Sequence, residues 1–275
     1  MASFDPDRVT TVLCDLDGVV WLAHEPIAGS VEAVAALRDA GRRVLFVTNN
    51  SMATQQQHVD ALASIGVPAT GDVVSSAMAA ASLVERGDRV LVVGGDGIVE
   101  AVERRGAIAV PVREHPDASG FDAVLVGLDR RFDYDGLAIA AAAVREGARL
   151  VGTNSDPTYP TPQGFLPGGG SILAAVATAA DADPVVCGKP HPPMAALIAD
   201  LLSSDAAPFD PDATLMVGDR ADTDGRFASA LGCAFALVRS GVTPPGTPVD
   251  EPVTIDAADL AELSRQLVTV GGRAQ

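Results

Sequence analysis

The chain has 275 residues, of which 48% are hydrophobic, and its formal net charge is −17. This length allows one large domain or two modest ones, and the acidic balance argues against a nucleic-acid partner, because phosphate backbones require a basic surface. No apolar stretch is long enough to span a bilayer, and residues 1–8 lack the apolar segment of a signal peptide, so the sequence predicts a cytoplasmic protein with no membrane partner.

Strand-like and helix-like segments alternate along the whole chain. Strands are predicted at 9–14, 43–48, 73–75, 89–93, 123–128, 149–153, 185–187, 215–218, 234–238 and 253–255. Ser30 and Ser51 are predicted to cap the first two helices. An alanine-rich helix is expected to run to residue 86, and further helices are expected at 97–105, 135–146, 171–180 and 260–267. Residues 156–170, rich in Pro and Gly, are expected to form a loop.

This alternation predicts an α/β fold with a doubly wound parallel sheet and helices on both faces. The interval between Thr48 and Lys189 holds several complete strand and helix units, more than a single crossover requires. The sequence therefore predicts two domains: a core formed by 1–86 and 185–275, and an inserted α/β domain at 87–184. The three cysteines are far apart in apolar runs, which favours buried free thiols in a reducing compartment.

The most informative segment is an apolar run that delivers Asp15 and Asp17 into a turn at Gly18. In open α/β sheets, ligands bind outside the carboxyl ends of the strands, where these two aspartates would emerge. Two carboxylates 4 Å apart repel each other by about 4 kcal/mol at an effective dielectric of 20, so a cation is needed there. The alternative is an Asp-Gly turn that closes a hairpin.

Other polar residues also fall at the ends of predicted strands. Thr48, Asn49 and Asn50 follow the second strand, Lys189 lies two residues after Cys187, and Asp219 follows Gly218. A parallel sheet brings the carboxyl ends of its strands to one edge, so these side chains are expected to meet there.

This set matches the needs of a phosphomonoester site. Asp15 is a suitable nucleophile, and Asp17 could protonate the leaving alcohol and later deprotonate water. Hydroxyl, amide and ammonium groups for the phosphoryl oxygens would come from Thr48, Asn49, Asn50 and Lys189. Mg²⁺ prefers oxygen ligands, and one ion among Asp15, Asp17 and Asp219 would offset their repulsion.

Four motifs stand in order: Asp15-Leu16-Asp17-Gly18, Thr48-Asn49, Lys189-Pro190, and Gly218-Asp219 followed by Asp224. With these motifs the sequence resembles the haloacid dehalogenase-superfamily phosphatases. The segments 153–157 and 167–171 further resemble the branch that contains 4-nitrophenylphosphatases and the phosphatases of phosphoglycolate, glycerol phosphate and pyridoxal phosphate. The resemblance covers nearly the whole chain, to about residue 267.

The resemblance implies a Mg²⁺-dependent phosphatase of small phosphorylated metabolites with an aspartyl-phosphate intermediate on Asp15. It implies that Asp17 is the general acid and base and reaches the metal through its backbone carbonyl. Asp219 would complete the metal site, and Asp224 would hold a metal-bound water or position Lys189. The inserted domain would be a cap that sets specificity, and caps of this branch often carry a homodimer contact.

In the cap, Asn154, Asp156 and Tyr159 either shape substrate specificity or only fold their loop. Asp222 reads as a residue at a helix start, and Arg220 either orients the carboxylates or forms a structural ion pair. The glycines at 168–170 favour a structural loop over an anion site. Two alternative functions stay open: a phosphotransferase or phosphomutase on the same scaffold, and a non-catalytic regulator that binds phosphometabolites.

Overall fold

The computed structural model describes residues 4–114, 117–161, 164–203 and 207–270. The chain forms two compact units. The first unit comprises Met1–Thr48, Val59–Val74 and Ile198–Gln275, and the second comprises Asn49–His58 and Ser75–Leu197. This division differs from the expected one for residues 49–58, 75–86 and 185–197, so the proposed core and cap boundaries stay a prediction.

The first unit is built on a six-stranded sheet, whose strands are β1 (Thr11–Cys14), β4 (Arg43–Thr48), β5 (Val73–Ser75), β13 (Thr214–Gly218), β14 (Ala234–Val238) and β15 (Ile255–Ala257). The strand order is β15-β14-β13-β1-β4-β5, and β1 pairs in parallel with both β13 and β4. The chain thus fills one side of β1 with β4 and β5 and the other side with β13 to β15. Such a topological switch point is where ligands bind in open α/β sheets.

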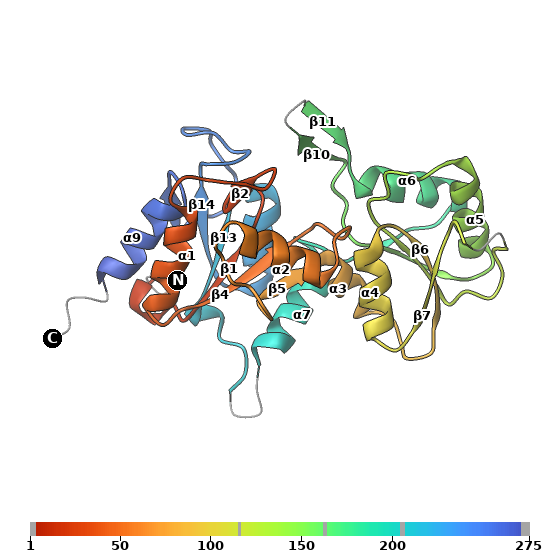
Figure 1. Ribbon diagram of the computed structural model, residues 1–275, viewed down its shortest axis with the longest axis horizontal. Helices are drawn as coiled ribbons and strands as arrows, with labels where there is room; N and C mark the ends of the chain where they lie inside the picture. The colour runs from red at the N-terminus through yellow and green to blue at the C-terminus, as the bar shows by residue number, and fades with distance from the viewer. Residues whose placement is uncertain (1–3, 115–116, 162–163, 204–206, 271–275) are drawn as a thin grey trace. The chain divides into compact units, whose positions relative to one another are not determined.

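Helices cover both faces of this sheet, as a doubly wound fold requires. Val12 and Cys14 join one apolar cluster with residues of α1 (Ser30–Asp39) and α9 (Leu260–Val270), which lie side by side in Figure 1. Leu13 points to the opposite face because side chains alternate along a strand, and it is also fully buried. The short helix α8 (Arg226–Leu231) packs against β13 and β14.

The second unit contains a five-stranded sheet made of β6 (Arg89–Val93), β7 (Ile108–Pro111), β8 (Ala123–Val126), β9 (Arg149–Gly152) and β12 (Val185–Val186). Its order is β12-β9-β8-β6-β7, and all its pairs are parallel. Its helices include α3 (Ser76–Ala81), α4 (Asp96–Arg104), α5 (Tyr134–Arg145) and α6 (Gly169–Ala180). Apolar residues of α5 and α6 cover the sheet in a second core cluster. Both parallel sheets with flanking helices confirm the predicted α/β class.

Several elements were not predicted. Where a loop was expected, β10 (Thr158–Thr161) and β11 (Gly164–Pro167) form an antiparallel hairpin. A second small hairpin joins β2 (Trp21–Leu22) to β3 (Glu25–Pro26). Strands this short carry too few residues to show an alternating pattern. Also not predicted from the sequence were β7, α8, α7 (Pro192–Leu202), η1 (Pro6–Arg8), η2 (Pro211–Ala213) and the π-helical turn η3 (Ala221–Gly225).

Both predicted helix caps were wrong. Ser30 lies inside α1, whose N-cap is Gly29, and its hydroxyl donates to the backbone oxygen of Val20 at 2.7 Å. The second helix, α2 (Gln55–Ser64), begins after Thr54 instead of Ser51. There Gln57 N–H donates to the Thr54 hydroxyl, and the Gln57 side chain accepts from Thr54 N–H, which is a capping box.

Within the described ranges, no helix combines the length and the apolar character needed to cross a bilayer.

Candidate functional site

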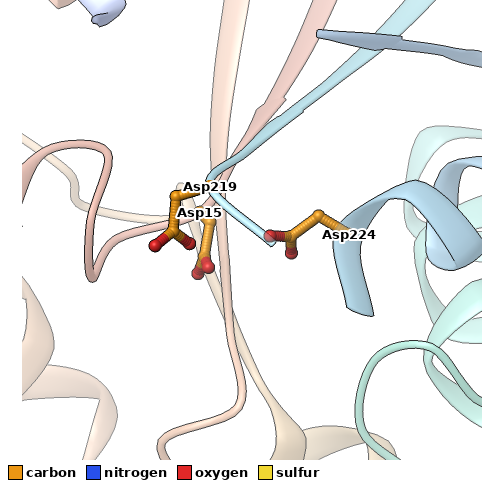
Figure 2. A group of neighbouring side chains, drawn as sticks. All are labelled: Asp15, Asp219 and Asp224. Carbon is orange, nitrogen blue, oxygen red and sulfur yellow. The ribbon is translucent and has the colours of Figure 1, made fainter. Parts of the chain in front are cut away.

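Three carboxylates meet at the switch point of the first unit. Cys14 pairs with Val217, so Asp15 emerges beside Gly218 and its N–H donates to the Val217 oxygen at 2.9 Å. Asp219 follows β13 directly, and Asp224 comes from η3. One carboxylate oxygen from each of the three residues lies within 4.8 Å of those from the other two, and Figure 2 shows the Asp224 carboxylate turned toward the other two. We call Asp15, Asp219 and Asp224 the acidic group.

Backbone N–H groups hold each carboxylate of the acidic group in place. Leu16 N–H donates to Asp15 Oδ1 at 2.8 Å, and Arg220 N–H donates to Asp224 Oδ2 at 3.2 Å. Val242 N–H, in the loop after β14, donates to Asp219 Oδ2 at 2.6 Å. These donors fix the orientation of the side chains and partly stabilise their negative charge.

Glycines make room for the two buried members, Asp219 and Asp224, which are 1% and 0% exposed. A Cβ atom at Gly18 or Gly241 would overlap the Asp219 carboxylate, and a Cβ atom at Gly218 would overlap that of Asp224. The packing around the acidic group therefore depends on the absence of side chains at these three positions.

The acidic group fits a hard divalent cation. Two unit charges 4.8 Å apart repel by about 3.5 kcal/mol at an effective dielectric of 20, so each pair in the group opposes folding unless it is compensated. All three side chains offer oxygen ligands, which Mg²⁺ and Ca²⁺ prefer. The Arg220 side chain pairs with the exposed Asp222 at 3.4 Å.

Asp17 and Thr48 lie in the same unit, but the Asp17 carboxylate is outside the acidic group. Asp17 is exposed, and its Oδ1 accepts a hydrogen bond from the indole Nε1 of Trp21 at 3.1 Å. Thr48 is the last residue of β4, the strand beside β1, and is 2% exposed. Sequence reasoning missed Trp21 because the short hairpin that presents it was not predicted.

Sequence reasoning also missed the loop after β14, which the structure places against the acidic group. Besides the bond from Val242, the Ser240 hydroxyl donates to the Gly18 oxygen at 2.7 Å, and the Thr243 hydroxyl donates to the Asp219 backbone oxygen. A signal was available, because this loop follows the carboxyl end of a predicted parallel strand, like the residues that were recognised.

A second set of polar residues lies within the second unit. Asn49 Nδ2 donates to Asp156 Oδ2 and to the Lys189 backbone oxygen, both at 3.0 Å. Asn154 Nδ2 donates to the Asn49 oxygen at 2.9 Å, while Asn154 Oδ1 accepts from Asp156 N–H at 3.1 Å. We call Asn49, Asn154 and Asp156 the amide group. It ties the segment after β4 to the loop after β9 and to the Lys189 backbone.

Close backbone packing surrounds the amide group. Gly188 N–H donates to the Thr153 oxygen at 2.7 Å, and a Cβ atom at Gly188 would approach both that oxygen and Asn49 Oδ1. The Lys189 side chain is 2% exposed. The glycines at 168 and 170 would place Cβ atoms against the backbone of Ser155 and Asp156, which explains the glycine run as a packing feature.

Two further predicted site residues lie outside the amide group. Asn50 is exposed, and its side chain accepts from Met52 N–H at 3.0 Å. Tyr159 is half-buried on β10, opposite Leu166 of β11. Near the amide group, His191 Nε2 lies 3.3 Å from the Ser155 hydroxyl. Burial lowers the pKa of His191, and the charge of Asp156 opposes this shift.

Comparison with known proteins gives consistent matches. Residues 12–108 match a family described as haloacid dehalogenase-like hydrolase, and residues 186–263 match one described as HAD-hydrolase-like. D-glycerol 3-phosphate phosphatase of Mycobacterium tuberculosis is 41% identical over 236 residues, which are 84% of this chain and 63% of that protein. 5'-Nucleotidase YutF of Bacillus subtilis is 36% identical over 84% of this chain and 87% of its own length.

Solved structures agree with these matches. The crystal structure of glycerol phosphate phosphatase from Mycobacterium tuberculosis in complex with magnesium is similar with a TM-score of 0.82. That alignment has 36% sequence identity and covers 96% of this chain and 79% of the other.

Proposed function

The chain belongs to the haloacid dehalogenase-like hydrolase family and is a phosphatase, and we propose that it hydrolyses small phosphomonoesters with Mg²⁺ through an aspartyl-phosphate on Asp15. The observation that carries this proposal is the convergence of Asp15, Asp219 and Asp224 at the switch point of a parallel sheet. Carboxylates from two distant parts of the chain are brought together there at an electrostatic cost that a metal ion would remove.

The acidic group suits Mg²⁺ because its ligands are carboxylate oxygens held in fixed orientations by backbone N–H groups. When bound, the ion would supply positive charge for the carboxylates and for the phosphoryl oxygens of the substrate. The similar glycerol phosphate phosphatase has structures with magnesium and with calcium, which supports a divalent cation at this site.

In the proposed reaction, an Asp15 carboxylate oxygen attacks the phosphorus atom. The bond from phosphorus to the leaving oxygen breaks, and Asp17 donates the proton that converts this oxygen to an alcohol. Water then attacks the phosphorus atom while Asp17 takes one of its protons, and the bond from phosphorus to the Asp15 oxygen breaks. This releases inorganic phosphate and restores the Asp15 carboxylate. Family motifs assign the phosphoryl oxygens to Thr48, Lys189 and the Asn49-Asn50 turn.

The amide group gives Asn154 and Asp156 a proposed role in shaping the loop that selects substrates. Asn154 is 6% exposed and uses both its amide nitrogen and its amide oxygen in hydrogen bonds, so its contribution would be to hold the loop. Tyr159, on the hairpin that follows, is proposed to contact the leaving group. A homodimer through the cap and a cytoplasmic location are further proposals carried by the family resemblance.

The experiment that tests the function measures phosphate release with Mg²⁺ from a panel of glycerol phosphate, phosphoglycolate, pyridoxal phosphate, sugar phosphates and nucleotides. We expect turnover of at least one of them, loss of turnover with EDTA, and a ~10⁴-fold or larger drop for Asp15→Asn. An Asp222→Asn variant is the matched control, since Asp222 is exposed and outside the acidic group. Turnover by Asp15→Asn near the normal rate would exclude Asp15 as the nucleophile.

A further inference from the structure

The reaction described above assigns no role to the hydrogen bond between Trp21 and Asp17. Trp21 is 2% exposed, whereas Asp17 is exposed, so a core side chain reaches out to a surface carboxylate. Its Nε1 donates to Asp17 Oδ1 at 3.1 Å. Gly18 N–H donates to the Trp21 oxygen at 2.8 Å, and Trp21 N–H donates to the Leu16 oxygen at 3.2 Å. These two backbone hydrogen bonds fix the turn between Asp17 and Trp21.

The indole ring itself is anchored. It belongs to the main apolar cluster of the first unit, and the ring of His24 lies 4.9 Å away between centroids, tilted by 55°. A buried indole N–H needs an acceptor, and here the acceptor is the carboxylate that carries the proposed proton transfer. Packing of the ring in the core therefore fixes the position of the Trp21 Nε1 donor.

We propose that Trp21 is a positioning residue that holds the Asp17 carboxyl group in one rotamer for proton transfer. This inference rests on the proposed function, in which Asp17 protonates the leaving oxygen. An exposed aspartate otherwise samples several rotamers, and the loss of that freedom is easier when a rigid partner is already in place. The indole is a donor only, so it binds a carboxylate oxygen and takes no proton from it.

The leaving group of the substrate tests this role. An alkyl phosphate, such as glycerol phosphate, needs a proton on its leaving oxygen, whereas 4-nitrophenyl phosphate releases a stable phenolate without one. We therefore compare the kcat/KM value of one ester with that of the other. Each kcat/KM value covers the steps up to formation of the aspartyl-phosphate and does not include its later hydrolysis. A merely structural defect would lower both values equally.

Trp21 is the only tryptophan in the chain, so replacing tryptophan throughout with its benzothiophene analogue removes this single N–H and keeps the ring. We expect kcat/KM for the alkyl ester to fall about 10-fold, part of the 10²–10⁴ that a general acid contributes, while the aryl ester changes less than about 2-fold. Trp21→Phe should follow the same pattern. Equal losses for both esters, or no loss for either, would overturn the proposal.

His24→Asn is the matched control. It removes the ring that packs on Trp21 but keeps the indole donor, and asparagine tolerates the left-handed backbone at this position, where φ is 69°. The ratio of the two kcat/KM values should match the unmodified protein. A shift in this ratio as large as that of the analogue would show that ring packing, and not the N–H group, is responsible.

A second measurement does not depend on activity. The sole indole N–H gives one resonance in a ¹⁵N-resolved NMR spectrum, and Asp17→Ala should move it and speed its exchange with solvent. An unchanged resonance would overturn the contact itself. If the unmodified protein releases phosphate from no ester of the panel named above and not from 4-nitrophenyl phosphate, the proposed function fails, while this spectrum still decides whether Trp21 holds Asp17.

Discussion

The acidic group of the first unit and the amide group of the second unit differ in the partners of their polar atoms. In the acidic group, three carboxylates face one another within 4.8 Å. In the amide group, one carboxylate, that of Asp156, accepts from an amide, and amides bond to backbone oxygens. The first arrangement brings like charges together, and the second joins hydrogen-bond donors to acceptors.

From this difference we infer that the acidic group serves metal binding and that the amide group holds loops of the second unit together. Like charges brought close together raise the free energy of the folded state, and a bound cation lowers it again. Hydrogen bonds between amides, a carboxylate and backbone oxygens need no cation. Substitutions in the two groups should therefore have opposite consequences for stability and activity.

The largest expected effect is on activity in the acidic group. Asp219→Asn keeps an oxygen that can accept from Val242 N–H but removes one charge from the proposed metal site. We expect kcat/KM for phosphate release to fall about 10³-fold, since metal ions contribute several kcal/mol to such transition states. Asp222→Asn serves again as control. Activity within a few-fold of normal would contradict the assignment of Asp219 to the metal.

Thermal unfolding with and without Mg²⁺ tests whether the acidic group, and not the amide group, binds the metal. A cation that binds only the folded state at 100 times its Kd should stabilise the protein by about 2.7 kcal/mol. Asp219→Asn should lose this response, and in EDTA its Tm should exceed that of the unmodified protein because one buried repulsion is gone. Asp156→Asn, in the amide group, should keep the full response to Mg²⁺. Equal responses in all three proteins would break the distinction between the groups.

In the amide group the expected effect is on folding. Asn154→Ala removes the bonds to the Asn49 oxygen and to Asp156 N–H at a buried position, so the free energy of unfolding should fall by about 1–3 kcal/mol in urea titrations. Glu103→Ala, on the exposed side of α4, should change it by less than about 0.5 kcal/mol. A neutral Asn154→Ala would mean that the network is not structural.

The smallest effect concerns thiol chemistry. Burial raises the pKa of Cys187 in the second unit from 9.0 to about 12, and burial does the same to Cys233 in the first unit. A pKa raised by folding contributes stability below pH 9, and this contribution is lost as the pH rises toward 12. Both thiols should therefore resist iodoacetamide at pH 8.5 until urea unfolds the chain, as followed by mass spectrometry. Alkylation of the fully buried Cys187 in the folded protein would contradict its burial, and Cys233, which is half-buried, should react before it.

Local patterns predicted much of this protein. Apolar runs at 43–48, 89–93 and 234–238 became strands with those bounds, because hydrophobic periodicity reports burial directly. The four motifs identified Asp15 and Asp219 before any contact was known, since each follows a strand of a parallel sheet. Helix caps were less predictable, because Ser30 and Ser51 offer the right side chains but tertiary contacts use them elsewhere, as with the bond from Ser30 to Val20.

The sequence by itself determined the α/β class, the longer strands of both sheets, and which strand ends carry carboxylates, amides and a lysine. Only the tertiary structure decided that the Asp17 carboxylate turns to Trp21, that the loop at 240–243 holds Asp219, and that Asn49 joins Asn154 and Asp156. The physical reason is range. Periodicity and strand ends are properties of neighbouring residues, whereas the contacts of Asp219 and Asn49 join segments that are far apart in the sequence. The contact between Asp17 and Trp21 is local, but it lies in an irregular turn that has no periodic pattern.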